Sequence, residues 1–264
     1  MATMIRPPML NADNVLAQKL NHFTRLSHDE VMAVQEAADG LQRTLAAKRD
    51  LIREGEPPHA AFLFTAGWAC RYKTLADGRR QIVSFLLPGD LCDMNNHVLK
   101  AMDHAIGALT PIRYVEISHE RVAALAETSA RIGEALWWQV LVNMAVQREW
   151  TLNNGQRSAL ERIGHLFCEL HYRLRCVGLT SGTGYAFPLT QNDLAEATGL
   201  TPVHVNRTLQ EMRAAGLIVL RERVLEIPDL EVLEDTVLFN PDYLHLDRQE
   251  PRTTARQASL RVGR

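Results

Sequence analysis

The apolar positions of the first fifty residues repeat with a helical period. Val15, Leu16, Leu20 and Phe23 recur at spacings that place them on one side of a helix. Ser27 then begins the pattern Ser-x-x-Glu, in which the serine and the glutamate three residues later cap the start of a second helix. The pattern therefore predicts helices within residues 12–49.

Residues 48–117 change to short apolar runs that are separated by turn residues. A Gly-Glu-Pro-Pro break lies within residues 54–58, and residues 61–75 alternate between apolar and polar positions. The Asp77–Gly78 pair is a hairpin signal between two such runs. Strands at this spacing, with no helix between them, predict a small antiparallel roll or barrel.

A long helix is predicted over residues 129–154, after a shorter helical segment at 117–127. Its apolar residues fall on nearly every side, so the helix must be buried on several sides. We expect one side to pack on the roll and another on a second copy of the helix, and the alternative is the central helix of a monomeric core. These apolar residues are Ile132, Leu136, Trp137, Trp138, Val140, Leu141, Val142, Met144, Val146 and Trp150.

The polar stretch 153–158 ends this pattern and is the best domain boundary. Ser158 and Glu161 form a second capping-box pattern, which begins a helix that stops at Gly178. A Gly/Ser/Thr-rich loop follows. Further along, residues 217–228 read as two short strands. The last residues, 247–264, are polar and rich in arginine, and we expect them to be disordered, with contact to phosphate as the less favoured role.

Two short helices joined at Gly199 are predicted within residues 189–218. Thr190 can cap the first helix, and Gly199 can end it because glycine accepts a positive φ. Thr201 is a preferred N-cap residue, and Pro202 is a preferred first helical residue. This combination favours a helix-turn-helix over a generic helical hairpin.

The second of these helices has one apolar and one polar face. Val205, Leu209 and Met212 form the apolar stripe. The opposite face carries side chains that bind base edges, because arginine pairs with guanine, and asparagine or glutamine pairs with adenine. Arginine near the end of the helix is better placed for phosphate. The residues assigned to DNA contact are Thr190, Gln191, Thr201, Val203, His204, Asn206, Arg207, Gln210 and Arg213.

The charge of the chain limits how it can bind DNA. The formal net charge is −2 over 264 residues, and residues 158–228 contain seven arginines and seven acidic residues. Non-specific affinity for DNA should therefore be modest, and useful affinity needs two copies of the helix on two half-sites, about 34 Å apart. This requirement again favours a homodimer.

Other functional classes are less compatible with the sequence. No secretory signal or membrane-spanning run is present, so we expect a cytoplasmic protein. The four cysteines form no Cys-x-x-Cys pair, which gives no reason to expect a metal site and indicates free thiols. No nucleophile–base pair or phosphate loop indicates an enzyme. The remaining alternative is a ligand-binding module whose winged helix contacts proteins.

The order of these parts resembles the CRP/FNR family of bacterial transcription regulators. The resemblance covers about residues 15–228, and its most specific parts are "LLPGDL" and the helix-turn-helix that ends in "GLI". It implies an α+β fold with an N-terminal antiparallel, cyclic-nucleotide-binding-like β-roll and a C-terminal winged helix-turn-helix. The implied segments are a sensor roll with flanking helices (12–128), a long dimerisation helix and hinge (129–156), the DNA-binding domain (157–230) and a C-terminal extension and tail (231–264).

The same resemblance implies a homodimer on a palindromic double-stranded DNA operator, contact with RNA polymerase, and no membrane association. Arg207 matches the arginine of the family that reads a guanine. Many members carry an acidic residue where this chain has Val203, and a polar or basic residue where it has Pro202. The operator should therefore differ from that of the best-known members.

The effector of the roll is not identified by the sequence, and no cofactor is assigned. Family members that bind cyclic nucleotides hold the phosphate with an arginine and the ribose with a glutamate, but the approximate matches here are Asp93-Met94 and Met102-Asp103. Because an acid replaces the cation, we expect that cyclic AMP is not the effector. The candidate effector-pocket residues are Asp93, His97, Asp103, His104 and Arg148.

Overall fold

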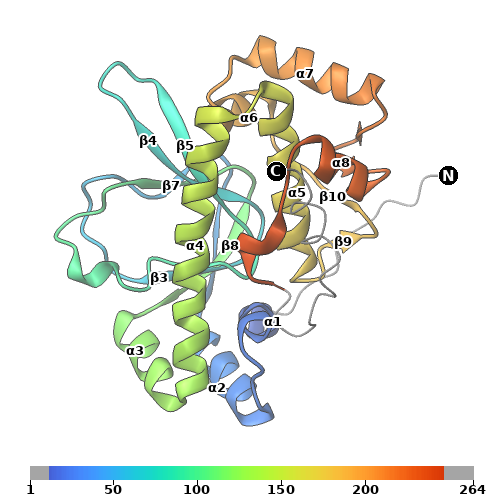
Figure 1. Cartoon of the computed structure of the whole chain (residues 1–264). Helices are drawn as coiled ribbons and strands as arrows, with labels where there is room; N and C mark the ends of the chain where they lie inside the picture. Colours follow the sequence, from blue (N-terminus) through green and yellow to red (C-terminus); the bar gives the residue numbers. More distant parts are fainter. Residues whose placement is uncertain (1–11, 247–264) are drawn as a thin grey trace, which may run out of the picture.

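The computed structural model describes residues 12–246, with side chains from Val15 onward. A roll of two four-stranded antiparallel sheets lies on one side of a long helix, and a smaller domain with its own sheet lies on the other side (Figure 1). The strand orders of the roll are β1-β8-β3-β6 and β2-β7-β4-β5. Its strands are β1 Gln42–Leu45, β2 Asp50–Ile52, β3 Ala61–Ala66, β4 Ala69–Thr74, β5 Arg80–Leu86, β6 Leu91–Cys92, β7 Ala105–Ala108 and β8 Ile112–Ile117. A short 3-10 helix, η1 (Asn96–Val98), lies in the loop after β6.

The helices before the roll are shorter than the sequence predicts. Helix α1 (Ala12–Phe23) and helix α2 (His28–Ala38) are present, and Ser27 and Glu30 form the expected capping box. The prediction of helix up to residue 49 is wrong, because the chain leaves α2 at Asp39 and pairs as β1 with β8. Gly40 makes this change of direction possible, since a Cβ there would lie 2.8 Å from the Val115 side chain.

Helix α3 (His119–Thr128) leads into helix α4 (Ala130–Gln156), which contains 27 residues and runs along the whole roll (Figure 1). The polar stretch that begins at Asn153 does not break α4 where the sequence predicts a break. The helix continues to Gln156 and ends at Arg157, whose ψ of 149° is extended. The α4 end of the hinge is therefore Arg157, directly before the capping box of Ser158 and Glu161.

The C-terminal domain contains a helix-turn-helix and a four-stranded sheet of order β11-β12-β10-β9. The segment that we expected to be a loop before the helix-turn-helix forms a hairpin that extends this sheet, so that expectation was wrong. Tyr185 anchors the hairpin, because its buried hydroxyl donates to the Phe167 carbonyl at 2.8 Å. The elements are α5 Ala159–Arg175, β9 Thr180–Ser181, β10 Gly184–Ala186, α6 Gln191–Thr198, α7 Pro202–Ala214, β11 Val219–Arg221 and β12 Val224–Glu226.

The beginning of the expected C-terminal extension is folded against the rest of the protein. Helix α8 (Leu230–Thr236), the 3-10 helix η2 (Pro241–Leu244) and the segment between them contribute Leu233, Leu244 and Phe239, respectively, to the buried core. The segment returns to α4, where the ring of His245 lies 5.0 Å from that of Trp138. The expected disordered tail, residues 247–264, lies outside the described residues.

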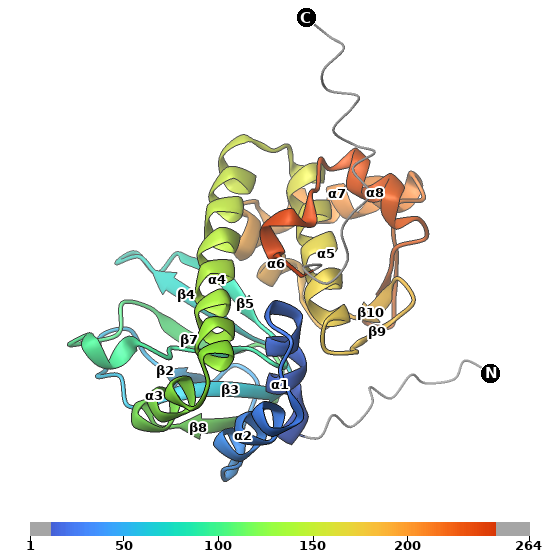
Figure 2. The same cartoon turned by 60° about the horizontal axis from the view of Figure 1, so that its bottom comes forward.

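The two domains share a continuous apolar core in this conformation. The ring of Trp68 in the roll lies 6.3 Å from that of Phe187 in the C-terminal domain, and Phe85 lies 5.7 Å from Trp150 of α4. Figure 2 shows α1 between the lower end of α4 and the hairpin β9–β10. The position of the C-terminal domain is therefore set by contacts with the roll as well as by the hinge.

Candidate DNA-binding face and sensor cavity

The turn between α6 and α7 has the local chemistry that a helix-turn-helix requires. Thr190 and Asp193 form a capping box at the start of α6, and Gly199 ends α6 with a φ of 67°. The Thr201 hydroxyl accepts from the backbone N–H of His204 at 3.2 Å and so caps α7, in which Pro202 is the first residue. These caps fix the position at which α7 begins and therefore which of its residues point outward.

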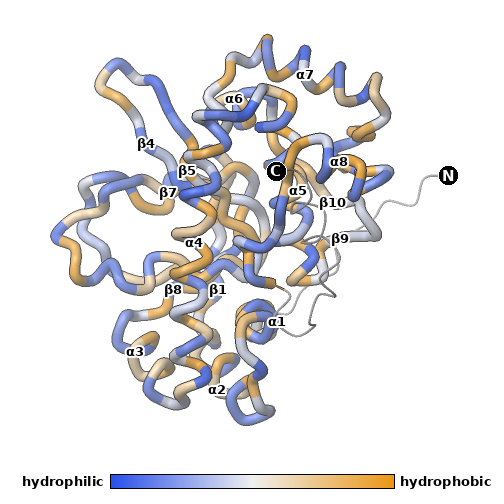
Figure 3. Tube along the Cα trace, in the orientation of Figure 1, coloured by the Kyte–Doolittle hydropathy of each residue, from blue (hydrophilic) through white to orange (hydrophobic). Residues whose placement is uncertain are grey.

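The outward face of α7 is the one that the sequence predicts. Val205, Leu209 and Met212 are buried, at most 2% exposed, whereas Val203 at the opposite side is 80% exposed. Figure 3 shows the resulting alternation of hydrophobic and hydrophilic residues along α7. The exposed members of the polar face are Asn206, Arg207 and Gln210.

The other candidate DNA-contact residues surround this face. Thr190, Gln191 and Thr201 are exposed at the starts of α6 and α7, and His204 and Arg213 are partly exposed. The amide of Asn206 donates to Oε1 of Gln191 at 3.3 Å, so α6 and α7 are joined across the face. All nine residues thus lie on the N-terminal end of α6 or along α7.

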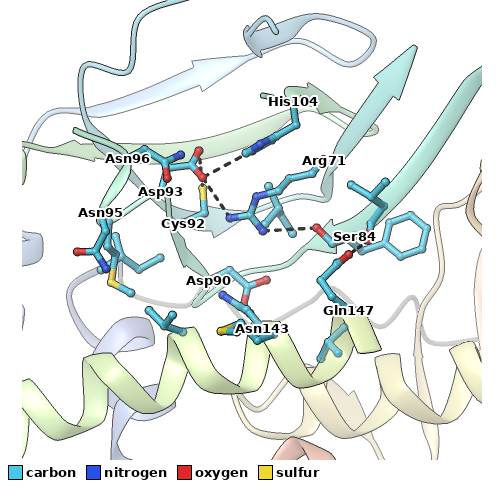
Figure 4. Close-up of a pocket in the computed structure, with 18 of the residues that line it drawn as sticks. Arg71, Ser84, Asp90, Cys92, Asp93, Asn95, Asn96, His104, Asn143 and Gln147 are labelled. Carbon is cyan, nitrogen blue, oxygen red and sulfur yellow. Dashed lines mark hydrogen bonds and ion pairs between the residues drawn. The ribbon is translucent and has the colours of Figure 1, made fainter. Parts of the chain in front are cut away.

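A cavity of about 560 Å³ lies between the roll and α4 (Figure 4), and we call it the sensor cavity. Arg71 of β4 extends into it and lies 3.4 Å from Asp93 and 3.4 Å from the Ser84 hydroxyl. Asn143 and Gln147 line the cavity from α4. The cavity is therefore formed by residues from strands β4 and β5 and from the long helix α4.

The charges in the sensor cavity compensate one another. Burial opposes the charged form of Asp93, but the contacts with His104 and Arg71 outweigh this effect and lower the pKa of its carboxyl. His104 also lies 2.7 Å from the carboxylate of Asp103. Asp93 is thus an anion at neutral pH and holds a cationic partner in the cavity.

Three of the five candidate effector-pocket residues line this cavity, namely Asp93, Asp103 and His104. The other two were assigned wrongly. His97 lies on η1 with its ring 5.0 Å from that of His119, and Arg148 is exposed on α4. His97 was assigned from its place in the sequence and Arg148 from its place on the long helix, and neither shows which side of a helix or turn faces the cavity.

Arg71 is the cavity residue that sequence reasoning missed. The sequence shows no arginine at the family's phosphate-binding position, and β4 supplies one to the cavity from a different position. The strand alternation contained a signal: Arg71 and Lys73 are two residues apart and so share one face of β4, and both line the cavity. Only the pairing of β4 with β5 shows that this face is the inner one.

Asp90 of the "LLPGDL" segment connects the roll to the C-terminal domain. Its carboxylate accepts from Nη2 of Arg173 on α5 at 2.9 Å, from the backbone N–H of Leu87 at 2.8 Å, and from Lys19 of α1. Burial opposes the charged form, but Lys19 and Arg173 outweigh it and lower the pKa of Asp90. A second contact joins Arg80 of β5 to Glu196 of α6 at 3.5 Å.

One face of α4 carries large apolar side chains that no described residue of the chain covers. Trp137, Leu141, Met144 and Leu152 are 46–64% exposed and follow the helical period, with Arg148 on the same face. An apolar stripe of this kind on a soluble surface marks an interaction site. This apolar stripe is adjacent to the face of α4 that lines the sensor cavity.

Two further observations concern the described residues, 12–246. None of their helices has the length and apolar character needed to cross a membrane. They also contain no group of three or more histidine, cysteine, aspartate or glutamate residues arranged to hold a metal ion.

Comparison with family models identifies both domains. Residues 42–129 match the cyclic nucleotide-binding domain, and residues 161–236 match the Crp-like helix-turn-helix domain. Together the two matches cover more than half of the chain and occur in the order that the fold shows. The second match ends with the last residue of α8, so η2 lies beyond it.

Curated relatives match this chain over most of their length. The chain is 26% identical over 181 residues to the transcriptional activator protein FnrL of Cereibacter sphaeroides, covering 67% of this chain and 72% of the relative. It is 27% identical over 199 residues to the nitrogen fixation regulation protein FixK of Rhizobium meliloti, covering 73% and 85%.

Solved structures show the same fold at lower identity. FixK2 from Bradyrhizobium japonicum aligns with a TM-score of 0.65 at 22% identity, covering 75% of this chain and 96% of that chain. A CooA mutant from Carboxydothermus hydrogenoformans aligns with a TM-score of 0.61 at 15% identity, covering 89% and 100%. These similarities support the fold alone, and the two domain matches identify what each part is.

Proposed function

The chain belongs to the CRP/FNR family of transcription regulators, and from this premise we propose that it acts as a homodimer on a two-fold symmetric DNA operator. The observation that carries the proposal is the α7 face, where buried and exposed residues alternate as a recognition helix requires. In this proposal α7 enters the major groove, and Asn206, Arg207 and Gln210 contact base edges.

The remaining candidate residues have positioning roles in this proposal. Thr190, Gln191 and Thr201 are exposed at helix starts, where backbone N–H groups and hydroxyls bind phosphate. Arg213 lies near the end of α7 and pairs with phosphate, while His204 and Val203 contact the groove. Val203 offers an apolar surface, which suits the methyl group of thymine.

The exposed apolar stripe on α4 supports the dimer. Trp137, Leu141, Met144 and Leu152 would pack against the same residues of a second copy, because a two-fold axis brings one patch onto itself. Near-neutral charge in the DNA-binding domain also makes two half-sites necessary for useful affinity.

The signal acts through the sensor cavity in this proposal, and cyclic AMP is not that signal. Asp93 and Asp103 bring negative charge to the cavity, and Arg71 is already paired with Asp93. On the basis of the family, the proposal also includes contact with RNA polymerase and a cytoplasmic location. The family resemblance also favours a regulator over an enzyme.

Selection of binding sites from a pool of random duplexes tests the proposal. The full chain should enrich a palindromic motif, and a variant with alanine at Asn206, Arg207 and Gln210 should enrich none. Sedimentation should give a dimer for the wild type and a monomer for Leu141→Glu. Failure of the wild type to enrich any motif would favour the alternative, a ligand-binding module whose winged helix contacts proteins.

A further inference from the structure

The segment that follows α8 lies beyond both of the matched domains, and we call its residues 237–246 the strap. The strap leaves the C-terminal domain at the end of α8 and runs back to α4 (Figure 1). The hinge at Arg157 lies between α4 and α5, so a segment that contacts both helices spans the hinge. The strap therefore lies where it can control the angle between the two helices.

The strap packs closely against α5. Val237 is fully buried, and a Cβ at Gly164 of α5 would lie 2.5 Å from its Cγ1 atom. Glycine destabilises the interior of a helix relative to alanine, so its presence here is explained by the close approach of the strap. Phe239 and Tyr243 cover the buried ring of His165, at ring distances of 4.9 Å and 5.9 Å. Packing thus fixes this part of the strap to α5.

A polar contact through Glu169 of α5 joins the strap to both helices. The Tyr243 hydroxyl donates to Oε2 of Glu169 at 3.0 Å, and the indole N–H of Trp150 on α4 donates to the same oxygen at 3.0 Å. Glu169 is fully buried, and burial raises the pKa of Tyr243 well above its ordinary value. The hydroxyl therefore stays protonated and remains a donor at neutral pH. One carboxyl group thus holds the strap, α4 and α5 together.

The strap also contacts the hinge and α4 directly. Nη2 of Arg157 donates to the Leu238 carbonyl at 3.4 Å, and the ring of His245 lies 5.0 Å from that of Trp138. Because Trp138 lies several helical turns before Arg157, the strap holds the direction of α4 and not only its end.

We propose that the strap fixes the angle between α4 and α5 and thereby sets the spacing of the two half-sites that the dimer recognises. In the proposed dimer each α4 lies at the two-fold axis, so the angle at the hinge decides how far apart the two α7 helices lie. Without the strap the hinge samples other angles, and restricting them on binding lowers the affinity for DNA. The inference rests on the proposed function for the dimer and its operator, but the hold of the strap on the hinge can be measured without DNA.

Hydrogen exchange on the full chain, measured by mass spectrometry, tests whether the strap holds the hinge. The variant Tyr243→Ala/His245→Ala removes the contacts with Glu169 and Trp138, and its backbone amides in residues 153–162 should exchange at least about fivefold faster than in the wild type. Glu231→Gln changes an exposed residue of α8 outside the strap and should exchange as the wild type does. If the double variant does not fold by circular dichroism, Tyr243→Phe, which removes only the hydroxyl, should show a smaller increase in the same segment.

Selection of binding sites from random duplexes tests whether the strap sets the half-site spacing. The wild type should enrich half-sites at one spacing, whereas the double variant should enrich the same half-site sequence at several spacings. The affinity of the double variant for the wild-type operator should fall at least about tenfold, because its hinge is no longer held before binding. Its affinity for a single half-site should not change, since α7 is intact.

Unchanged exchange in the double variant and in Tyr243→Phe would overturn the proposal. Faster exchange with an unchanged half-site spacing and an unchanged operator affinity would also overturn it. A wild type that enriches no motif would overturn the proposed function and the half-site spacing with it, while the exchange measurement, which uses no DNA, would still decide whether the strap holds the hinge.

Discussion

The α7 face and the sensor cavity differ in how their polar side chains are held. On α7, Asn206, Arg207 and Gln210 are exposed on one continuous helix, and the apolar residues beneath them provide the stability. In the cavity, Arg71 comes from β4 and Asp93 from the loop after β6, and both side chains are largely buried. A residue of the α7 face can therefore change without affecting folding, whereas a charged residue of the roll interior cannot change without leaving a buried partner unpaired.

The largest expected effect concerns the buried aspartate that joins the two domains. Asp90→Asn leaves Arg173 and Lys19 without their shared carboxylate, and breaking a buried ion pair costs about 3–5 kcal/mol. Urea denaturation of the wild type and the variant measures this change in the free energy of unfolding. Asp77→Asn is the matched control, because its exposed pair with Arg79 should contribute less than about 1 kcal/mol. A similar loss in both variants would contradict the comparison.

Neighbouring residues on α7 should separate stability from DNA binding. Leu209 is 2% exposed, so Leu209→Ala should lower the free energy of unfolding by about 2–5 kcal/mol. Gln210 is exposed, and Gln210→Ala should change it by less than about 0.5 kcal/mol. Urea denaturation checks both, and a large loss in Gln210→Ala would show that the outward face has a structural role.

Arg207→Ala should weaken operator binding by about 1–3 kcal/mol per half-site, because a bidentate contact with guanine is lost. Fluorescence anisotropy on the selected duplex at fixed salt measures it, with thermal melting to show that the fold is unchanged. Arg213→Ala should instead reduce affinity for all duplexes alike. Unchanged operator affinity in Arg207→Ala would remove this residue from the recognition face.

The smallest effect is a pH dependence at the hinge. Contact with His165 outweighs burial and, with Arg157, lowers the pKa of Glu149 from 4.5 to about 2. The folded state therefore favours the charged form, and the stability that this provides is present above pH 4.5 and lost as the pH falls towards 2. The difference in unfolding free energy between the wild type and Glu149→Gln should narrow over this range. Exposed Glu127→Gln should show no such change, and a constant difference for Glu149→Gln would contradict the prediction.

Elements with strong local signals were predicted most successfully. The capping boxes at Ser27 and Ser158, the turn at Asp77–Gly78 and the buried stripe of α7 are all present. Each depends on residues within about four positions of one another, where backbone geometry is set by local hydrogen bonds and side-chain packing. The same locality explains why the outward residues of α7 were identified in full.

The errors arise where one segment pairs with another that is distant in the sequence. Residues 42–45 form a strand because β8 offers a free edge, and the segment before α6 forms a hairpin because the wing offers another. Helical periodicity in the first case, and glycine-rich composition in the second, contain no information about that partner. The sequence likewise does not show that His97 and Arg148 lie outside the lining of the sensor cavity.

The sequence by itself determined the order of the domains and the outward polar face of α7, since both depend on short-range periodicity, capping residues and motifs. Only the tertiary structure decided that Arg71 enters the sensor cavity and that Asp90 of the roll pairs with Arg173 of the C-terminal domain. These pairs join residues from separate strands and helices, and burial holds them together. Their energies depend on local desolvation, which is a property of the packed molecule and not of any single segment.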